Sequence, residues 1–390
     1  MNAYRRRPVF AAACVGMLLF GIVLTTLGAV LPSIIERLGL DRTEAGSLLA
    51  LLSLGILAGS LVFGPVVDRR GYKGMLAAAV ALIALGLEGI AFAPSIVLLA
   101  IAAVLVGFGG GVINGGTNAL VADISAAGRA AGLAYLGVFF GLGAFGVPFM
   151  LGLLRERFGD ARVVAGIGVL VALVLLYYAA IRFPEPKQPQ GFPLRQAVGL
   201  LRDPALVLLG VILFFESGME ITVGGWTATY INQELTLPPE RALYLLSLYW
   251  LGMTGARLAL GRLLKRVSPV AVLLSSLGVA FAGAMILIGA QTTASAGAGT
   301  LLAGAGFAAV FPVILGYVGD RYERMSGTAF GVVLVMALTG GTALPYATGV
   351  LGDAFGLRPS LMIVPAGLIC VALIFAITRP RLRTSPQAAG

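Results

Sequence analysis

The chain alternates long apolar stretches with short polar connections along its whole length. A helix needs about 20 mostly apolar residues to cross a bilayer. Twelve stretches reach this length and predict transmembrane helices, because in lipid every backbone polar group must be paired within its own segment. The predicted spans cover residues 9–35, 44–66, 73–93, 95–122, 129–154, 162–182, 204–232, 241–264, 269–290, 294–318, 326–352 and 359–378.

The longest polar connection reads FPEPKQPQGFPLRQAVGLLRD and is rich in proline and charge. Such a composition is typical of a linker. It divides the predicted spans into two sets of six. We therefore expect an N-terminal six-helix bundle over residues 1–182, a cytoplasmic linker over 183–203 and a C-terminal bundle over 204–390.

The two halves also carry an internal repeat. Several residues recur at a constant separation of 197 positions, and an offset of six spans predicts two bundles of parallel topology with a binding site between them. The matched pairs are Gly55 and Gly252, Gly64 and Gly261, Asp123 and Asp320, Gly143 and Gly340, Pro148 and Pro345, Gly152 and Gly349, Phe158 and Phe355, and Gly159 and Gly356.

The composition agrees with a membrane protein, and the placement of Lys and Arg explains the positive net charge. Hydrophobic residues make up 59% of the chain and charged residues 11%, against about 25% in soluble domains. The net charge of +10 comes from Lys and Arg in loops on the side of the termini and the linker, so we expect no nucleic-acid partner. By the positive-inside rule, both termini are predicted to be cytoplasmic.

Little in the sequence suggests a cofactor, a metal or an enzyme. There is no histidine, and both Cys14 and Cys370 fall in apolar spans, so neither a metal site nor a disulfide framework is indicated. The glycine-rich run at 107–112 lies inside a span and lacks the GK[ST] ending of a nucleotide-binding loop. With no catalytic constellation visible, we expect no enzyme activity and no cofactor.

A motif between the second and third predicted spans indicates a family. Residues 64–73, GPVVDRRGYK, resemble the major facilitator signature G-x-x-x-D-R-x-G-R-K, with tyrosine at the second-last position. Together with the spans and the repeat, the resemblance implies an all-α membrane protein of twelve helices in two pseudo-symmetric bundles. It also implies alternating access, and we expect a multi-pass monomer in a bacterial inner membrane.

The motif suggests gating residues. Asp68 can accept backbone hydrogen bonds at a helix N-terminus or pair with arginine, which would hold one conformation. The simpler alternative is that the neighbouring cations only fix the topology. Arg257, inside the eighth span, is assigned to the same inner gate. The expected gating residues are Asp68, Arg69, Arg70, Lys73 and Arg257.

Two carboxylates lie one helical turn apart near the middle of the seventh span. A charge at this depth is costly unless it is paired or hydrated, which makes Glu216 and Glu220 candidates for function. A carboxylate that gains and loses a proton in each cycle would couple transport to a proton gradient. The simpler alternative is a protonated side chain that only hydrogen-bonds between helices.

The seventh span, FFESGMEITVGGWTATY, resembles the fucose–proton symporter and hexose carrier branch. The resemblance implies a sugar substrate and proton symport. Members of that branch also place carboxylates in spans one and four, where this chain has none within the apolar part. A carrier that uses no proton is therefore kept as an alternative.

Candidate substrate ligands come from the fourth and seventh spans. Asn114 and Asn118 share a face and suit a hydroxyl-rich ligand, although hydrogen bonds between helices explain them nearly as well. Trp226 and Tyr230 also share a face and can stack on a sugar ring or anchor at the membrane interface. By the family's arrangement alone, Phe139, Phe311 and Tyr346 join the candidates.

The leading hypothesis is secondary transport of a small polar solute, a sugar by resemblance. Efflux of amphipathic drugs or organic ions is one alternative, although the fifth span, GLGAFGVP, does not match the G-P-x-x-G-G run of drug antiporters. A membrane sensor that does not transport is the second alternative.

Overall fold

The computed structural model describes residues 4–124, 129–186, 194–322 and 325–382, and no strand forms within them. The first half contains α1 (Arg6–Leu38), α2 (Arg42–Phe92), α3 (Ile96–Ile124), α4 (Arg129–Phe158) and α5 (Asp160–Ala180). A short helix that the sequence analysis did not predict, α6 (Leu194–Leu200), lies in the linker. The second half contains α7 (Pro204–Glu234), α8 (Pro239–Leu263), α9 (Pro269–Ile288), α10 (Thr293–Phe307), α11 (Val310–Arg321), α12 (Ser326–Phe355), α13 (Leu357–Ser360) and α14 (Ile363–Leu382).

Helix α2 is a hairpin of two spans. Its 51 residues are interrupted at Gly71, whose φ of 71° and ψ of 177° are not helical and lie where glycine meets no steric penalty. Arg37, in the last turn of α1, donates to the carbonyls of Ala91 at 2.7 Å and Ile90 at 3.3 Å. The last turn of α2 therefore lies beside the last turn of α1, which is the helix that leads into the first turn of α2. Of the described helices, 11 are long and apolar enough to cross a membrane, and the hairpin makes twelve spans, which confirms the predicted fold class.

The tenth span is broken between α10 and α11. Pro312 lies in the first turn of α11, where it has no N–H to donate to the carbonyl of Ala308 and its ring crowds that carbonyl. Ala308 and Ala309 separate the two helices. The break places Phe307 and Phe311 on either side of a bend.

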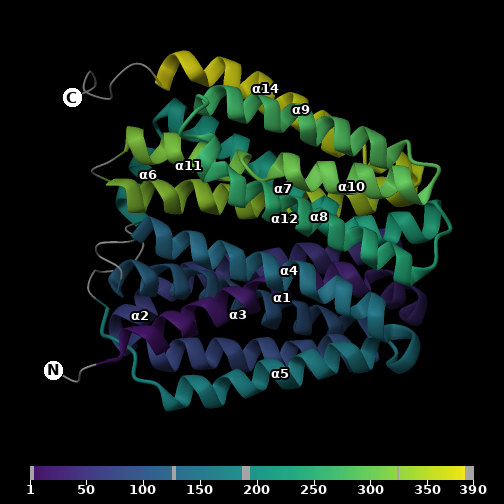
Figure 1. The fold of residues 1–390 in the computed structure, drawn as a ribbon, viewed down its shortest axis with the longest axis horizontal. Helices are drawn as coiled ribbons and strands as arrows, with labels where there is room; N and C mark the ends of the chain where they lie inside the picture. The colour runs from purple at the N-terminus through teal and green to yellow at the C-terminus, as the bar shows by residue number, and fades with distance from the viewer. Residues whose placement is uncertain (1–3, 125–128, 187–193, 323–324, 383–390) are drawn as a thin grey trace.

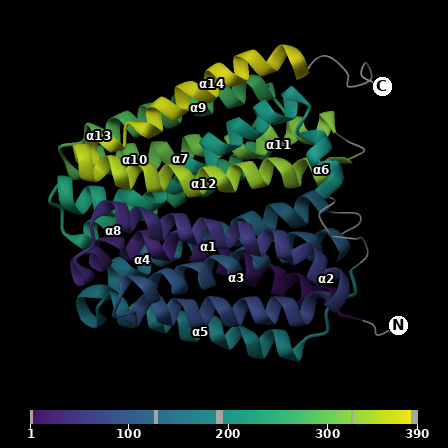
Figure 2. The same ribbon diagram turned by 180° about the vertical axis from the view of Figure 1, so that it is seen from behind.

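The helices form two bundles that lie side by side, one from α1–α5 and one from α7–α14 (Figures 1 and 2). Helix α1 is central, with 72% of its most apolar window buried, whereas the corresponding share for α5 is 28%. Leu170 and Leu176 of α5 are 65% and 69% exposed. Such apolar side chains suit contact with lipid, so α5 is a peripheral support and α1 faces the interior.

Glycine contacts repeat between the halves at the spacing seen in the sequence. A Cβ on Gly107 would lie 2.1 Å from the carbonyl oxygen of Leu52, and one on Gly304 would lie 1.9 Å from that of Tyr249. Each residue of the second pair lies 197 positions after its counterpart in the first pair. Small residues permit such close backbone approach between membrane helices. The repeated glycines therefore allow an equivalent close helix crossing in each half.

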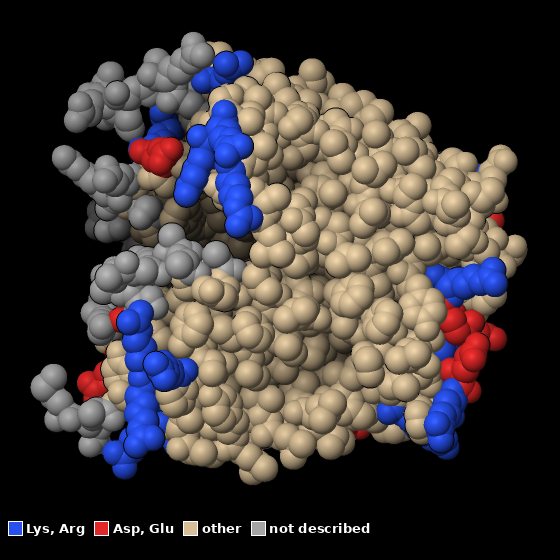
Figure 3. Space-filling model, in the orientation of Figure 1, with Lys and Arg blue, Asp and Glu red and all other residues tan. Residues whose placement is uncertain are grey.

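The halves meet where α1 packs on α7, α2 on α12 and α4 on α8. At the α1–α7 crossing, a Cβ on Gly28 would lie 2.7 Å from the carbonyl oxygen of Gly224. We call the end of the molecule opposite the chain termini the distal end. Lys and Arg dominate the terminal end, where the surface is hollowed between the halves, whereas basic and acidic side chains intermingle at the distal end (Figure 3).

Candidate functional site

Two carboxyl groups meet at the middle of α7. Glu216 is 1% exposed, and no donor among the described residues hydrogen-bonds either of its carboxyl oxygens. Its carboxyl group lies against that of Glu220, one turn along the helix. Two carboxyl groups can share a hydrogen bond only when one of them is protonated, so the pair suits a site that holds a proton.

Arg257 of α8 completes this cluster. Its guanidinium Nη2 lies 3.6 Å from a carboxylate oxygen of Glu220, and its Cζ lies 5.8 Å from the ring centre of Phe140, which belongs to α4 of the other half. The side chains of Arg257 and Glu220 are 29% and 13% exposed, so solvent reaches the ion pair. The sequence analysis placed Arg257 at the inner gate, and the structure brings it to the carboxyl pair.

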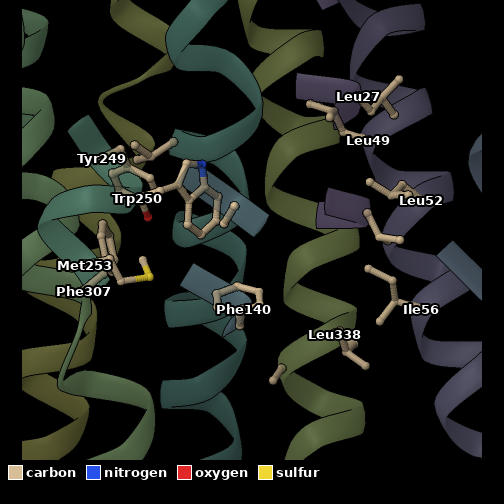
Figure 4. Close-up of a cluster of buried hydrophobic side chains, with 14 of the residues drawn as sticks. Leu27, Leu49, Leu52, Ile56, Phe140, Tyr249, Trp250, Met253, Phe307 and Leu338 are labelled. Carbon is tan, nitrogen blue, oxygen red and sulfur yellow. The ribbon is translucent and has the colours of Figure 1, made fainter. Parts of the chain in front are cut away.

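An aromatic cluster lies beside the ion pair. Trp250 makes edge-on contacts with Tyr249 at 5.0 Å and with Phe140 at 6.0 Å between ring centres (Figure 4). Phe20 of α1 lies 5.7 Å from Phe140. The indole N–H of Trp250 is buried and has no acceptor among the described residues, although buried donors are normally satisfied. The sequence analysis missed Trp250, because its neighbours on other helices give no local signal.

The seventh-span aromatics serve packing in this conformation. Trp226 and Tyr230 are both fully buried. The indole N–H of Trp226 donates to the carbonyl of Pro345 at 3.0 Å, and the hydroxyl of Tyr230 donates to the carbonyl of Ile288 at 2.7 Å. Neither ring is open to a solute here, and their assignment as ligands stays a prediction.

The other ligand candidates are exposed to different degrees. Asn114 and Asn118 of α3 are partly exposed and bonded to each other, with the amide of Asn118 donating to the side-chain oxygen of Asn114 at 3.1 Å. Phe139 and Phe311 are half-buried, and Tyr346 is 43% exposed. The asparagines retain unused hydrogen-bonding capacity, since an amide offers two donors and one acceptor oxygen.

The signature motif lies at the terminal end. Asp68, Arg69 and Arg70 are exposed and precede the break in α2. Lys73 donates to the carbonyl of Ala179 at 2.7 Å, where a cation suits the C-terminal end of α5. Their gating role stays a prediction.

The tyrosine that departs from the family signature has a partner. The hydroxyl of Tyr72 donates to Asp123 of α3 at 2.8 Å. Asp123 is one of the residues that repeat between the halves, and the hydrogen bond ties α2 to the end of α3. The sequence analysis missed this contact, since it treated the motif only through its charges.

A second tyrosine–carboxylate contact holds the terminal end of the other half. Asp203 accepts a backbone hydrogen bond from Ala205 at the start of α7 and one from the hydroxyl of Tyr322 at 2.5 Å. Arg321 lies 3.6 Å from the same carboxylate. Burial, and then the hydrogen bond to Asp203, raise the pKa of Tyr322. The hydroxyl therefore keeps its proton and stays a donor at physiological pH.

A polar cluster at the distal end joins the two halves. Asp353, near the end of α12, accepts hydrogen bonds from the backbone N–H of Arg42 at 3.0 Å and of Thr43 at 2.7 Å, and from the hydroxyl of Thr43 at 2.6 Å. Arg42 also donates to the carbonyl of Gly352 at 2.6 Å and lies 3.8 Å from Glu234. We call these residues the distal clasp. A carboxylate at the start of α2 is favoured by the helix dipole.

The second distal contact joins α4 to α8. Arg155 lies 3.1 Å from Asp160 of its own half and 3.6 Å from Glu240 of the other half. Ser33 of α1 donates to Asp160 as well. The sequence analysis did not single out Arg42 or Arg155, and it missed their contacts across the interface.

We predict that the distal clasp holds the distal end closed. Asp353→Ala removes the acceptors at the start of α2, which are worth about 1 kcal/mol or more as a helix cap. Ser53, buried on α2 at 1% exposure, provides the reporter. In a variant lacking Cys14 and Cys370, alkylation of Ser53→Cys from the distal side should accelerate about fivefold.

Asp41→Ala is the matched control for this experiment. Asp41 also caps α2, by accepting from the backbone N–H of Glu44 at 2.7 Å, but both residues belong to the same half. This control should leave the alkylation rate near that of the parent. Equal rates in the Asp353 and Asp41 variants would show that the clasp does not hold the halves together.

The comparisons with known proteins identify the family. The family model for the Major Facilitator Superfamily matches residues 13–345. The chain belongs to this superfamily of membrane transporters. Among the described residues, no group of three or more His, Cys, Asp or Glu side chains is placed to hold a metal ion.

Some relatives are named for their substrates. The chain is 26% identical to the 3-(3-hydroxy-phenyl)propionate transporter of Escherichia coli, over 95% of this chain and 94% of the relative. It is 24% identical to the sodium-dependent glucose transporter 1A of Mus musculus, over 94% and 95%.

Solved structures share the fold. The crystal structure of the nucleoside transporter NupG, solved as a point mutant, superimposes with a TM-score of 0.82 at 16% identity, over 96% of this chain and 99% of that chain. The D-xylose–proton symporter gives a TM-score of 0.79 at 16% identity, over 95% and 97%. These likenesses place the described helices in the major facilitator fold.

Proposed function

We propose that this protein is a secondary active transporter that moves a small polar solute by alternating access and is driven by a proton. The observation that carries the proposal is the cluster of Glu216, Glu220 and Arg257, in which two carboxyl groups and one cation meet at mid-depth. Ionisable groups within the membrane are costly and mark ion or substrate pathways. A buried carboxyl pair beside a partly exposed arginine suits the gain and loss of one proton.

The relatives support a polar solute that carries a ring. Their names include glucose and a hydroxyphenylpropionate, and the structural neighbours are named for nucleosides and xylose. Asn114 and Asn118 of α3 carry amides with spare hydrogen-bonding capacity, and the indole N–H of Trp250 has no acceptor among the described residues. A sugar, as the resemblance of the seventh span implies, would use these donors together with a stacking ring.

Drug efflux and a sensor that does not transport are the competing functions. Amphipathic drugs need a large apolar pocket, whereas here an ion pair lies beside the aromatic cluster. A sensor would bind its ligand without moving it. Uptake into proteoliposomes therefore separates transport from sensing, and the chemistry of the transported solute separates the two kinds of carrier.

The test begins with the purified protein. A ligand that binds only the folded state raises the melting temperature by mass action, so a thermal-shift screen of sugars, organic acids and cationic drugs finds the solute. Proteoliposomes with an imposed pH gradient then show whether the solute accumulates. A solute that enters but never exceeds the outside concentration would contradict proton coupling.

We also propose that the termini and the linker lie in the cytoplasm of a bacterium, with the protein in the inner membrane as a monomer. The Lys and Arg side chains at the terminal end support this orientation. In a variant lacking Cys14 and Cys370, an impermeant thiol reagent outside intact cells should label Gln291→Cys and spare Arg266→Cys. Both positions are exposed, and they flank α9 at its two ends. The reverse pattern would invert the topology.

A further inference from the structure

The proposed function leaves the substrate class open, and the charges at the carboxyl pair narrow it. We propose that Arg257 binds the carboxylate of a small aromatic or apolar monocarboxylate when Glu220 takes up the coupling proton. This inference rests on the proton coupling proposed above. It names the ligand that replaces Glu220 as the counter-charge of Arg257.

The charges around Glu220 are few. Arg257 and Glu216 are the charged groups that bear on it, and the hydroxyl of Tyr249 donates to its backbone carbonyl at 3.4 Å. Helices α1, α10, α11, α12, α13 and α14 also pack on α7. Helix α10 has no charged residue, and the charged residues of the others lie in end turns. Arg257 therefore finds its counter-charge at this depth in the carboxyl pair or in a ligand.

The resting cluster holds one proton. An ionised Glu216 would be a buried charge that no donor among the described residues stabilises, which is strongly unfavourable. A neutral Glu216 beside an ionised Glu220 and a cationic Arg257 gives a net charge of zero. The side-chain arrangement fits this state, since Glu220 and not Glu216 forms the ion pair.

A second proton changes the net charge of the cluster, and that charge determines which kind of substrate can bind. When Glu220 accepts a proton from solution, its ion pair with Arg257 breaks and the guanidinium is left without a counter-charge. A neutral solute such as a sugar would leave the guanidinium unpaired within the membrane, which is unfavourable even where some solvent reaches it. A monocarboxylate restores neutrality, and its two oxygens match the fork of the guanidinium. One proton and one anion then cross together without net charge.

The surroundings of Arg257 suit an apolar body behind that carboxylate. The cation lies over Phe140, and Phe20 and Trp250 contact the same ring. These three aromatic side chains come from both halves of the protein. Aromatic rings favour offset or edge-on contact with another ring. The indole N–H of Trp250, which has no acceptor within the described part of the chain, can donate to a polar substituent.

Binding to the purified full chain in detergent tests the inference. The probes are 4-hydroxybenzoate and cyclohexanecarboxylate, which are anionic at pH 6 and at pH 8, with their neutral amides and D-xylose as comparisons. The wild type should bind the carboxylates more tightly at pH 6 than at pH 8, by up to about tenfold per pH unit for one linked proton. It should bind neither the amides nor D-xylose measurably.

Two variants separate the roles of the partners. Glu220→Gln imitates the protonated carboxyl group and frees the arginine, so this variant should bind the carboxylates equally at both pH values. Arg257→Gln should lose at least about tenfold in carboxylate affinity, as expected for a charged hydrogen-bonded pair. Arg262→Gln is the matched control, because Arg262 is an exposed cation on the same helix. It should bind as the wild type does.

Several results would overturn the inference. They are undiminished carboxylate binding by a folded Arg257→Gln variant, unchanged pH dependence in Glu220→Gln, and a wild type that binds none of the carboxylates. Proton-driven uptake of D-xylose by the wild type would reject the anionic substrate and leave the proposed function standing. Carboxylate binding as described, without accumulation in a pH gradient, would instead remove the proton-driven function.

Discussion

Replacing Glu220 by glutamine should abolish solute accumulation driven by a pH gradient while binding persists. Glutamine keeps the size and hydrogen-bonding shape of a protonated carboxyl group but does not titrate. With one proton per solute and no net charge moved, a gradient of one pH unit supports about a tenfold accumulation. We expect the variant to equilibrate the solute to a ratio of about one, measured with radiolabelled solute in proteoliposomes.

Two further carboxylates make this experiment specific. Glu88 also lies inside an apolar span, but it belongs to the first half, where its carboxyl group on α2 faces Gly168 of α5. Glu88→Gln should accumulate solute as the wild type does. Glu216→Gln imitates the form that its surroundings favour, so it should retain most of the accumulation. Undiminished accumulation in Glu220→Gln would reject Glu220 as the proton carrier.

A single methyl group at Gly304 should destabilise the second half strongly. The Cβ of an alanine there would lie 1.9 Å from the carbonyl oxygen of Tyr249, which is shorter than any van der Waals contact. Helices α8 and α10 would have to separate, and overpacking of this kind costs about 1–3 kcal/mol or more. We expect Gly304→Ala to melt at least about 5 °C lower or to express poorly, as measured by thermal denaturation and size-exclusion chromatography.

Two other glycines provide a second test of this packing and a control. Gly107→Ala should be equally damaging, because its Cβ would lie 2.1 Å from the carbonyl oxygen of Leu52 at the equivalent crossing. Gly316 lies in α11 with no atom within 4 Å of a Cβ. Gly316→Ala should be neutral or slightly stabilising, since alanine favours helix formation. A Gly304→Ala variant as stable as Gly316→Ala would contradict the packing described.

The crossing at Gly304 also connects stability to function. Tyr249 lies at that close approach on α8, and its hydroxyl reaches the backbone of Glu220 on α7. Its neighbour Trp250 belongs to the aromatic cluster beside Arg257. The position of the proposed proton site therefore depends on a glycine that belongs to neither the carboxyl pair nor the aromatic cluster.

The sequence by itself determined the class of fold. Apolar length is a property of consecutive residues, so the twelve spans could be predicted from the chain, and α2 proved to be the predicted pair of spans joined at Gly71. The repeat was equally visible, because equivalent crossings need glycine at equivalent positions. Glu216 and Glu220 could be recognised together because one helical turn separates them.

Only the tertiary structure decided which partners these residues have. The ion pair between Arg257 and Glu220 depends on how α7 and α8 are rotated against each other, and the order of the helices leaves that rotation open. The distal clasp joins Arg42 to Asp353, residues 311 positions apart, and Trp226 turned out to face Pro345. Hydropathy specifies that a segment crosses the membrane but leaves its rotation and its neighbours free. The rotation of each helix and its neighbours are set by the close packing of small residues, and packing is a property of the assembled helices.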